Sequence, residues 1–143
     1  MKVKQISVFL ENKSGRLAAV TAVLAKHGIN IRALSIADTS DFGILRLIVD
    51  QPDKAFEVLK QEDFTVSVTD VIGVEMPDQP GGLAQVLAEL EKAEINIEYL
   101  YAFLGKAPGG ALVVFKVENI DTAIEKLLAS GVKLLPGETL YKM

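Results

Sequence analysis

The pattern of apolar and polar residues predicts two successive rounds of the same elements. In the first half, alternating or continuous apolar runs predict strands at 3–10, 30–37, 44–49 and 64–68. Apolar residues recur at helical spacing between Ser14, the expected N-cap, and Gly28, the expected C-cap. Pro52 opens a second helix, because proline is favoured at the first helical position. On the strand at 30–37, Ile31 and Ala33 are expected to share a face by alternation.

The second half repeats this order. The expected strands lie at 71–76, 96–104, 111–117 and 132–135, and helices are expected from 83 and over 120–130, before a capping Gly131. Turns are expected at 38–43, 106–110 and Pro136–Gly137, the last before a short apolar tail. No Gly/Ser-rich linker separates the strands at 64–68 and 71–76, so a flexible tether is excluded.

One stretch of sequence occurs twice. Residues 13–38 and 79–104 align without a gap at an offset of 66 (81 minus 15, and 97 minus 31), and eleven positions are identical. So many identities are far beyond chance and indicate an internal duplication. We therefore divide the chain into a first domain at 1–69 and a second at 70–143.

Each half reads strand, helix, strand, strand, helix, strand. With right-handed crossovers this order predicts an α+β fold of two ferredoxin-like βαββαβ sandwiches in tandem, with antiparallel sheets and helices on one face. A unit of roughly 70 residues buries only a modest core. We therefore expect the two units to share an interface, or the chain to form a homodimer.

Composition excludes several classes of protein. Half of the residues are hydrophobic (50%) and 24% are charged, as in a folded globular protein. The absence of cysteine removes disulfides and thiolate sites. A net charge of -4 without a basic patch argues against nucleic acid as a partner, and no run approaches the ~18 apolar residues that a membrane span needs. We expect a cytoplasmic protein with no metal and no cofactor, whose first residues do not lead into a signal-peptide run.

The candidate chemistry lies at the ends of the repeated stretch. Gly81 and Gly82 stand where a strand passes into a helix; free N–H groups there favour an anion such as a carboxylate, although a tight turn also demands glycine. Both copies place an amide or carboxylate side chain ahead of this glycine, and both place asparagine just after the helix, where it can also act as a C-cap. The single histidine, His27, is explained by helix capping.

These motifs resemble the ACT domain, here in tandem across essentially the whole chain. Asn12-Lys13-Ser14-Gly15-Arg16-Leu17 and Asp78-Gln79-Pro80-Gly81-Gly82-Leu83 match the family pattern of Asn or Asp, two residues, Gly, one residue and Leu. Ile-Asn-Ile at 29–31 and 95–97 opens the second strand of each copy. ACT domains are regulatory modules that bind amino acids.

The resemblance implies a site at the interface between ACT units. The second strands of two units lie side by side, and the effector lies between the loop after strand one and the second strand of the neighbour. Loop N–H groups would hold a carboxylate, and side-chain oxygens of Asn12 or Asp78 would accept from an ammonium. The implied ligand-binding residues are Asn12, Gly15, Arg16, Leu17, Asn30, Ile31, Asp78, Gly81, Gly82, Leu83, Asn96 and Ile97.

The two copies depart from the family pattern in different ways. Ser14 replaces the usual proline, Arg16 replaces a small residue, and Asp78 stands where the first copy has Asn12. Arg16 is expected either to assist a carboxylate or to be solvated, and the two sites are not expected to be equivalent. Tyr99, Tyr101 and Phe103 share one face of a strand, where they either pack against another element or wall a pocket.

The leading interpretation is a free-standing sensor with an amino-acid effector, acting through an unidentified enzyme or regulator. An acylphosphatase-like hydrolase on the same fold is the alternative. It needs an arginine in a phosphate-binding loop, and the loop around Arg16 has a single glycine. An RNA-binding sheet needs exposed aromatic and basic residues on the first and third strands, which the apolar runs at 44–49 and 111–117 do not offer.

Overall fold

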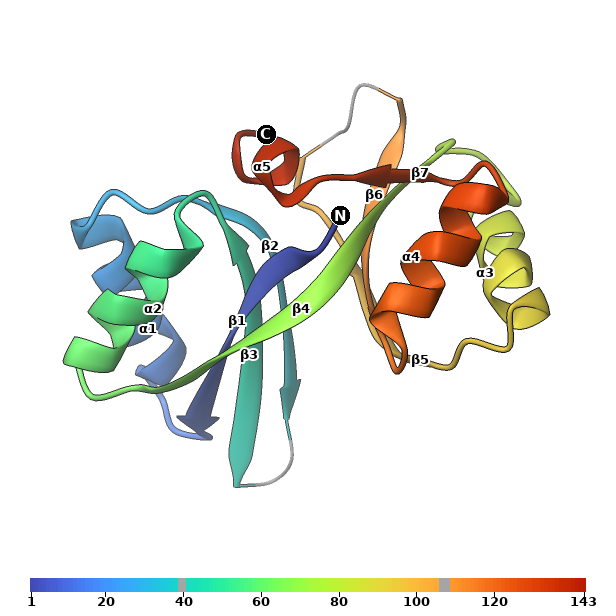
Figure 1. Cartoon of the computed structure of the whole chain (residues 1–143). Coiled ribbons are helices and arrows are strands. Elements are labelled where there is room, and N and C mark those ends of the chain that lie inside the picture. Colours follow the sequence, from blue (N-terminus) through green and yellow to red (C-terminus); the bar gives the residue numbers. More distant parts are fainter. Residues whose placement is uncertain (39–40, 106–108) are drawn as a thin grey trace. The chain divides into compact units, whose positions relative to one another are not determined.

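The computed structural model describes residues 1–38, 41–105 and 109–143 (Figure 1). The chain divides into two compact units: the N-terminal unit, Lys4–Thr69, and the C-terminal unit, Asp70–Met143 together with Met1–Val3. The elements are β1 (Val3–Glu11), α1 (Arg16–Lys26), β2 (Ile31–Asp38), β3 (Phe42–Val49), α2 (Pro52–Gln61), β4 (Thr65–Met76), α3 (Gly82–Lys92), β5 (Ile97–Ala102), β6 (Ala111–Val117), α4 (Ile120–Ala129), β7 (Lys133–Leu135) and α5 (Gly137–Tyr141).

Each unit has the predicted ferredoxin-like topology. In the N-terminal unit the strand order is β2-β3-β1-β4, and in the C-terminal unit it is β5-β6-β4-β7. β3 pairs antiparallel with both β1 and β2, and β6 pairs antiparallel with both β4 and β5. The predicted βαββαβ order is therefore confirmed in both copies, and β2 and β5 lie at sheet edges within the described residues.

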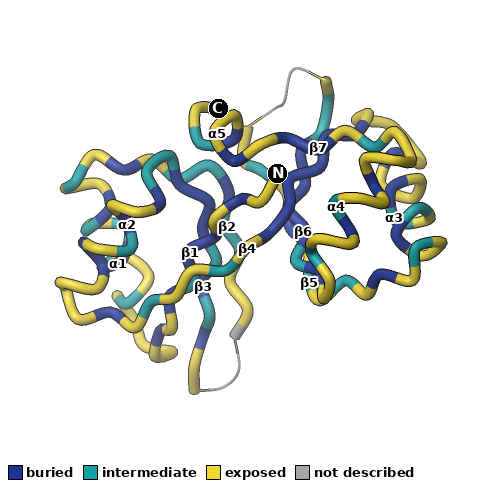
Figure 2. The backbone as a smooth tube through the Cα atoms, viewed as in Figure 1, coloured by how far each residue is buried: buried dark blue, intermediate teal, exposed yellow. Residues whose placement is uncertain are grey.

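One apolar core lies between helices and sheet in each unit. In the N-terminal unit, Val20 and Leu24 of α1 and Leu59 of α2 pack with Ile6 and Leu47 of the strands. Figure 2 draws the backbone as a tube, and both helices are largely exposed along it with buried positions at intervals. The C-terminal unit repeats this arrangement around Val86, Leu90, Phe115 and Leu127. Helical spacing of apolar residues thus confines each helix to one face of its sheet.

The predicted break between the strands at 64–68 and 71–76 is wrong. A single strand, β4, runs from Thr65 to Met76 through the end of one unit and the start of the other. Thr69 and Asp70 at the expected break are neither glycine nor proline, so nothing in the backbone chemistry interrupts the extended chain. The C-terminal tail also differs from the prediction, because Gly137–Tyr141 forms the short helix α5.

The helix ends are set by left-handed glycines. Gly15, and not the predicted Ser14, is the N-cap of α1, with φ 88° and no side-chain cap. At the other end His27 is the C-cap, followed by Gly28 at φ 69°. Ser130 likewise caps α4 ahead of Gly131, which has φ 80°. These conformations disfavour any residue with a Cβ, so the glycines fix the helix boundaries.

Strand alternation fails at the start of β2 and β5. The pairing register shifts between Ile31 and Ala33 in β2, and between Ile97 and Tyr99 in β5. As a result Ile31 packs on the helix-facing core together with Leu34, an odd separation that regular alternation forbids. The prediction that Ile31 and Ala33 share a face is therefore wrong. The expected turns at 38–43 and 106–110 lie partly outside the described residues.

The contact between Gly73 of β4 and Leu140 of α5 yields a stability prediction. A Cβ at Gly73 would lie 2.5 Å from Leu140 Cδ1, and Leu140 is fully buried. Gly73→Ala should therefore cost about 1–3 kcal/mol of unfolding free energy through overpacking. Leu140→Ala alone should cost roughly 2–5 kcal/mol, and the double variant should lose clearly less than the sum. Denaturant unfolding measures all three.

Gly105→Ala is the control for this cycle. A Cβ at Gly105 meets no atom within 4 Å, so unfolding free energy should change by no more than about 0.5 kcal/mol. Strict additivity of the Gly73 and Leu140 substitutions would contradict the proposed contact.

Candidate functional site

A small pocket lies beside the loop between β1 and α1 in the N-terminal unit. Its volume is about 190 Å³. Three of the residues predicted from the sequence line it: Asn12, Arg16 and Leu17. The other lining residues are Leu10, Glu11, Lys13, Ile36 and Gly43. The pocket will be called the loop pocket.

Gly15 lies within this loop and gives it its shape. A Cβ at Gly15 would meet nothing within 4 Å, so space does not demand glycine. The backbone does, since φ is 88°. Gly81 in the second copy has φ 87° and is equally open. The two loops therefore enter their helices with the same backbone conformation.

The loop pocket offers groups of both charge signs. The first N–H groups of α1 have no acceptor within their own helix, and the helix dipole adds partial positive charge at this end. Lys13 Nζ lies 2.9 Å from Glu11 Oε2. The hydrogen bond and the charge from Lys13 hold the pKa of Glu11 below its usual range, with a smaller contribution from Arg16. The pocket thus presents N–H donors for an anion and a carboxylate for a cation.

Arg16 packs over an aromatic ring. Its guanidinium carbon lies 5.0 Å from the centroid of the Phe64 ring, a cation–π arrangement. Its Nε is buried and has no hydrogen-bond partner among the described residues. The side chain is partly exposed, and its predicted part in holding a ligand carboxylate stays a prediction. It fills space against the turn between α2 and β4.

Asn30 and Ile31 do not reach the loop pocket of their own unit. β2 contributes Ile36 to the pocket, five positions beyond Ile31, and five positions of strand span roughly 17 Å. The predicted site therefore does not form within the N-terminal unit. Antiparallel pairing with a second β2 would reverse the direction and bring a different Ile31 to the loop.

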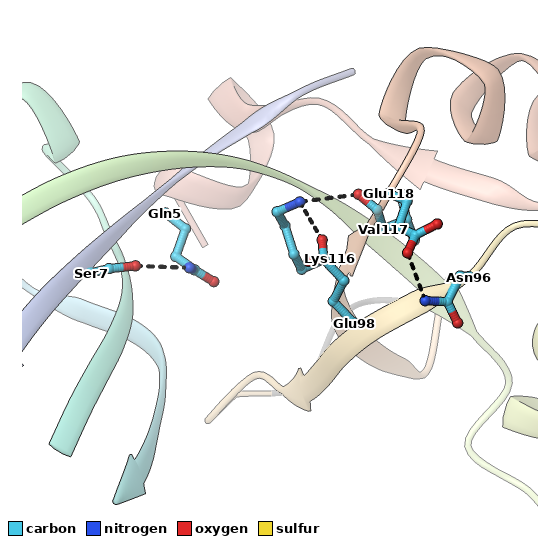
Figure 3. A network of polar contacts seen from close by, with 7 residues as sticks. All are labelled: Gln5, Ser7, Asn96, Glu98, Lys116, Val117 and Glu118. Carbon is cyan, nitrogen blue, oxygen red and sulfur yellow. Dashed lines mark hydrogen bonds and ion pairs between the residues drawn. The ribbon is translucent and has the colours of Figure 1, made fainter. Parts of the chain in front are cut away.

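Asn30 follows α1 and Asn96 follows α3. Their hydrogen bonds connect the starts of β2 and β5 to the residues that follow β3 and β6. The backbone N–H of Asn30 donates to Asp50 Oδ1 at 2.9 Å. Asn96 Nδ2 donates to Glu118 Oε1 at 3.0 Å (Figure 3), and the Glu118 N–H donates back to the Asn96 carbonyl. The side chain of Asn96 therefore has a structural role, whereas the bond to Asp50 uses only the backbone N–H of Asn30.

Five further residues of the loop pocket were not among the site residues predicted from the sequence: Leu10, Glu11, Lys13, Ile36 and Gly43. The signal was present in the topology. β1 and β2 both pair antiparallel with β3, so they run in the same direction and end together. The end of β2 must therefore lie beside the loop that follows β1.

The second predicted loop has a different setting. Asp78, Gly81 and Leu83 are exposed. Gly82 is buried, and it must be glycine because a Cβ there would clash with the Pro77 carbonyl. Gly82 lines a groove of about 760 Å³ between α3 and the turn from α4 to β7. Asp78, Leu83, Asn96 and Ile97 do not line this groove.

The tyrosines of β5 lie on the sheet face away from the helices. Tyr101 pairs with Val114 and Leu100 pairs with Phe115, which is in the core between helices and sheet. Tyr99 and Tyr101 stack with centroids 6.4 Å apart. Neither ring lines the groove or the loop pocket.

Other chemistry finds little support in the described residues. Within 1–38, 41–105 and 109–143, no three His, Asp or Glu side chains gather in a way that could hold a metal ion. No described helix is long and apolar enough to cross a membrane. His27 Nδ1 lies 2.9 Å from the Val23 carbonyl, as expected of a residue that closes α1.

The sequence and the fold are similar to those of known proteins. The sequence matches the ACT domain pair family over residues 1–143. Protein BT0572 from Bacteroides thetaiotaomicron has a crystal structure that is similar with a TM-score of 0.94, at 50% sequence identity, over 100% of this chain and 98% of that chain. The ligand-free regulatory subunit of aspartate kinase from Thermus thermophilus shares the fold, with a TM-score of 0.64 at 17% identity over 90% of each chain.

A curated relative matches over a shorter stretch. The acetolactate synthase small subunit of Buchnera aphidicola subsp. Baizongia pistaciae is 35% identical over 49 residues. This match spans 34% of the chain and 31% of that subunit, so the chain aligns with about a third of the relative.

The Glu11–Lys13 pair yields a pH prediction. Lys13→Met removes both the hydrogen bond and the charge that lower the pKa of Glu11, so this pKa should rise toward that of a free glutamate. In the unchanged protein Glu11 should stay ionised to a lower pH than a free glutamate, and should lose its charge only as pH falls through the lowered pKa. A carbon-detected NMR titration of the Glu11 carboxyl measures the shift, with exposed Lys26→Met as the control. Equal pKa values in the Lys13 variant and the parent would contradict the pairing.

Proposed function

The chain belongs to the ACT domain pair family, and from this premise we propose that it is a regulatory protein that binds an amino acid at the loop pocket. The observation that carries the proposal is the joint presence of a helix N-terminus, Lys13 and the Glu11 carboxylate around one small pocket. An amino acid carries a carboxylate for the two positive features and an ammonium for the Glu11 carboxylate.

The recognition follows from the charges. The α-carboxylate accepts from the N–H groups of α1 that follow Arg16, whose own N–H donates to the Lys13 carbonyl, and the helix dipole favours an anion there. The α-ammonium donates to Glu11 and to the side-chain oxygen of Asn12. Leu17 and Ile36 form the apolar lip against which the ligand side chain packs. A volume of about 190 Å³ is below the usual 300–1,000 Å³ of drug-sized sites, which suits one small metabolite.

We propose that a second copy of the chain completes the pocket. β2 is an edge strand with an exposed Ile36, and an unpaired apolar edge favours pairing with another strand. An antiparallel β2–β2 pair centred between Ala33 and Leu34 places Ile31 of one copy opposite Ile36 of the other. Asn30 of the second copy then borders the ligand, as the sequence motif implied.

The C-terminal unit carries the second copy of the same loop. Asp78 stands where the first copy has Asn12, and the backbone of Gly81 matches that of Gly15 within a few degrees. We propose that this loop, with Gly82, Leu83 and the β5 start at Asn96 and Ile97, forms a second and non-equivalent site. An aspartate in place of asparagine adds a negative charge and so favours the ligand ammonium.

We propose that the output is regulatory and not catalytic. The small subunit of acetolactate synthase, which matches part of the chain, is by its name a subunit of an enzyme. By analogy, ligand binding here would act through a partner enzyme or regulator. The hydrolase alternative requires an arginine facing a phosphate loop, whereas Arg16 lies over Phe64, so no observation favours it.

The ligand prediction is tested by calorimetric titration with the twenty standard amino acids. One or a few should bind, and at a hundredfold excess over Kd should stabilise the protein by roughly 2–3 kcal/mol. Leu17→Asp should weaken binding at the loop pocket by tenfold or more, because its carboxylate repels that of the ligand at roughly 1.4 kcal/mol per factor of ten. Leu83→Asp makes the same change at the second loop and shows which site responds.

Leu128→Asp is the surface control, because Leu128 is 45% exposed and Leu17 is 41% exposed. It should leave binding unchanged. Absence of heat and of stabilisation across the whole panel would refute the amino-acid proposal.

The dimer prediction is tested by sedimentation equilibrium. The unchanged protein should be dimeric, and Ile36→Lys should shift it toward monomer, because a lysine on an edge strand opposes pairing. Leu128→Lys should remain dimeric. A monomeric parent protein at about 100 μM, a concentration at which even a weak specific dimer forms, would rule out this partner strand.

A further inference from the structure

The two copies of the loop site differ in the size of one exposed apolar side chain. Ile36 lines the loop pocket from the end of β2 and is 51% exposed, and its counterpart at the offset of 66 is Ala102 of β5 (102 minus 36). Ile36 pairs with Leu45, which belongs to the core of the N-terminal unit. Ala102 pairs with Val113, which belongs to the core of the C-terminal unit. Ile36 and Ala102 therefore hold the same place beside the loops of their own units.

The other exposed apolar positions at the two loops are the same in both copies. Leu17 at the start of α1 and Leu83 at the start of α3 are identical, and they are exposed to a similar extent, at 41% and 37%. Ile31 and Ile97, which the proposed second copy supplies, are identical as well. These positions give the two sites no difference in preference for a ligand side chain.

The floor of the two sites differs by less than the strand position does. Leu10 pairs with Gly43 in the N-terminal unit, and Met76 pairs with Ala111 in the C-terminal unit. Leu10 and Met76 are both buried, and leucine and methionine are close in volume. Ala111 adds a single methyl group that Gly43 lacks. This addition is smaller than the loss of every Ile36 atom beyond Cβ.

Each site keeps a carboxylate beside its loop, at positions that differ by one residue. The N-terminal copy has Glu11 followed by Asn12, and the C-terminal copy has Pro77 followed by Asp78. Both loops enter their helices with the same backbone conformation. The ammonium and the carboxylate of an amino acid therefore meet similar groups in both copies, and the difference between the copies falls on the ligand side chain.

We propose that Ile36 and Ala102 set the length of the ligand side chain that each loop site accepts. The loop pocket takes an amino acid with a short aliphatic side chain, because Ile36 closes it. The second loop takes a longer aliphatic side chain, because Ala102 leaves room there, and Gly82 in place of Arg16 leaves more. The assignment rests on the amino-acid binding proposed above and adds the class of ligand for each site.

A homologous series of amino acids tests side-chain length at constant chemistry: L-alanine, L-2-aminobutyrate, L-norvaline and L-norleucine, titrated calorimetrically into the full chain. Leu83→Asp isolates the loop pocket, and Leu17→Asp isolates the second loop. In the Leu83→Asp protein, L-2-aminobutyrate should bind at least tenfold more tightly than L-norleucine. In the Leu17→Asp protein, affinity should rise roughly fourfold with each added methylene group through L-norleucine.

Two exchange variants test the assigned positions directly. Ile36→Ala, made in the Leu83→Asp protein, should move its preference to L-norleucine. Ala102→Ile, made in the Leu17→Asp protein, should move its preference to L-2-aminobutyrate, and it keeps the test decisive if Ile36→Ala loosens the proposed dimer. Leu128→Ala changes another exposed aliphatic residue and should leave both preferences unchanged. Thermal unfolding establishes that each variant is folded.

The outcomes separate this assignment from the proposed function. The same length preference at both sites would overturn the assignment, as would preferences that neither exchange variant alters. Binding of a polar amino acid, but of no member of the series, would also overturn it. In each of these cases amino-acid binding itself would stand. No binding of any standard amino acid or of the series up to about 10 mM would overturn both.

Discussion

The backbone turn at each helix start is the constraint on which the rest of the molecule depends. Gly15 and Gly81 adopt the left-handed conformation with φ values of 88° and 87°. An L-residue with a side chain would cost roughly 1–2 kcal/mol there. This turn connects the end of the first strand of each unit directly to the helix that packs on the sheet. The first N–H groups of that helix therefore lie at the end of the sheet. The loop pocket and the groove both border this turn.

The same backbone supports two different sites because the side chains around it have diverged. At the helix start one copy has Arg16, which covers Phe64, and the other has Gly82 opposite Val132. The Pro77 carbonyl lies so close to Gly82 that it leaves no room for a Cβ there. The absence of a side chain at Gly82 therefore permits the tight turn and also leaves the groove open. The carboxylate of Glu75 is buried in the C-terminal unit, whereas the equivalent position in the N-terminal unit is Phe9, which carries no charge.

The proposed dimer would link binding to assembly through the sheet edge. β2 contributes Ile36 to the pocket of its own unit, and in the proposed pairing its first residues, roughly 17 Å away at about 3.3 Å per residue, would border the pocket of the second copy. A ligand that contacts both copies would stabilise their pairing by mass action. In this arrangement an amino acid controls the oligomeric state, and a partner protein could read that state without any catalytic group in the chain.

The sequence by itself determined the duplication, the order of elements and the loop residues. A glycine next to a periodic run of apolar residues determines the local backbone conformation. Residues close together in the sequence control this conformation, so it can be predicted from the sequence. The strand and helix order was predicted correctly for this reason, although the N-cap of α1 is Gly15 and not Ser14. The bulges after Ile31 and Ile97 were not, since they depend on how two strands pair and not on either strand alone.

The tertiary structure decided which spaces are filled and which are open. Phe64 lies 48 residues from Arg16 (64 minus 16), and Lys133 lies 58 residues from Glu75 (133 minus 75), so neither contact leaves a local pattern. Strand direction separated Asn30 from Asn12, although the motif places both at one site. Charge burial at Glu75 likewise arises only when distant segments pack around it. The sequence thus fixes the framework of the loops, and packing between remote segments decides their chemistry.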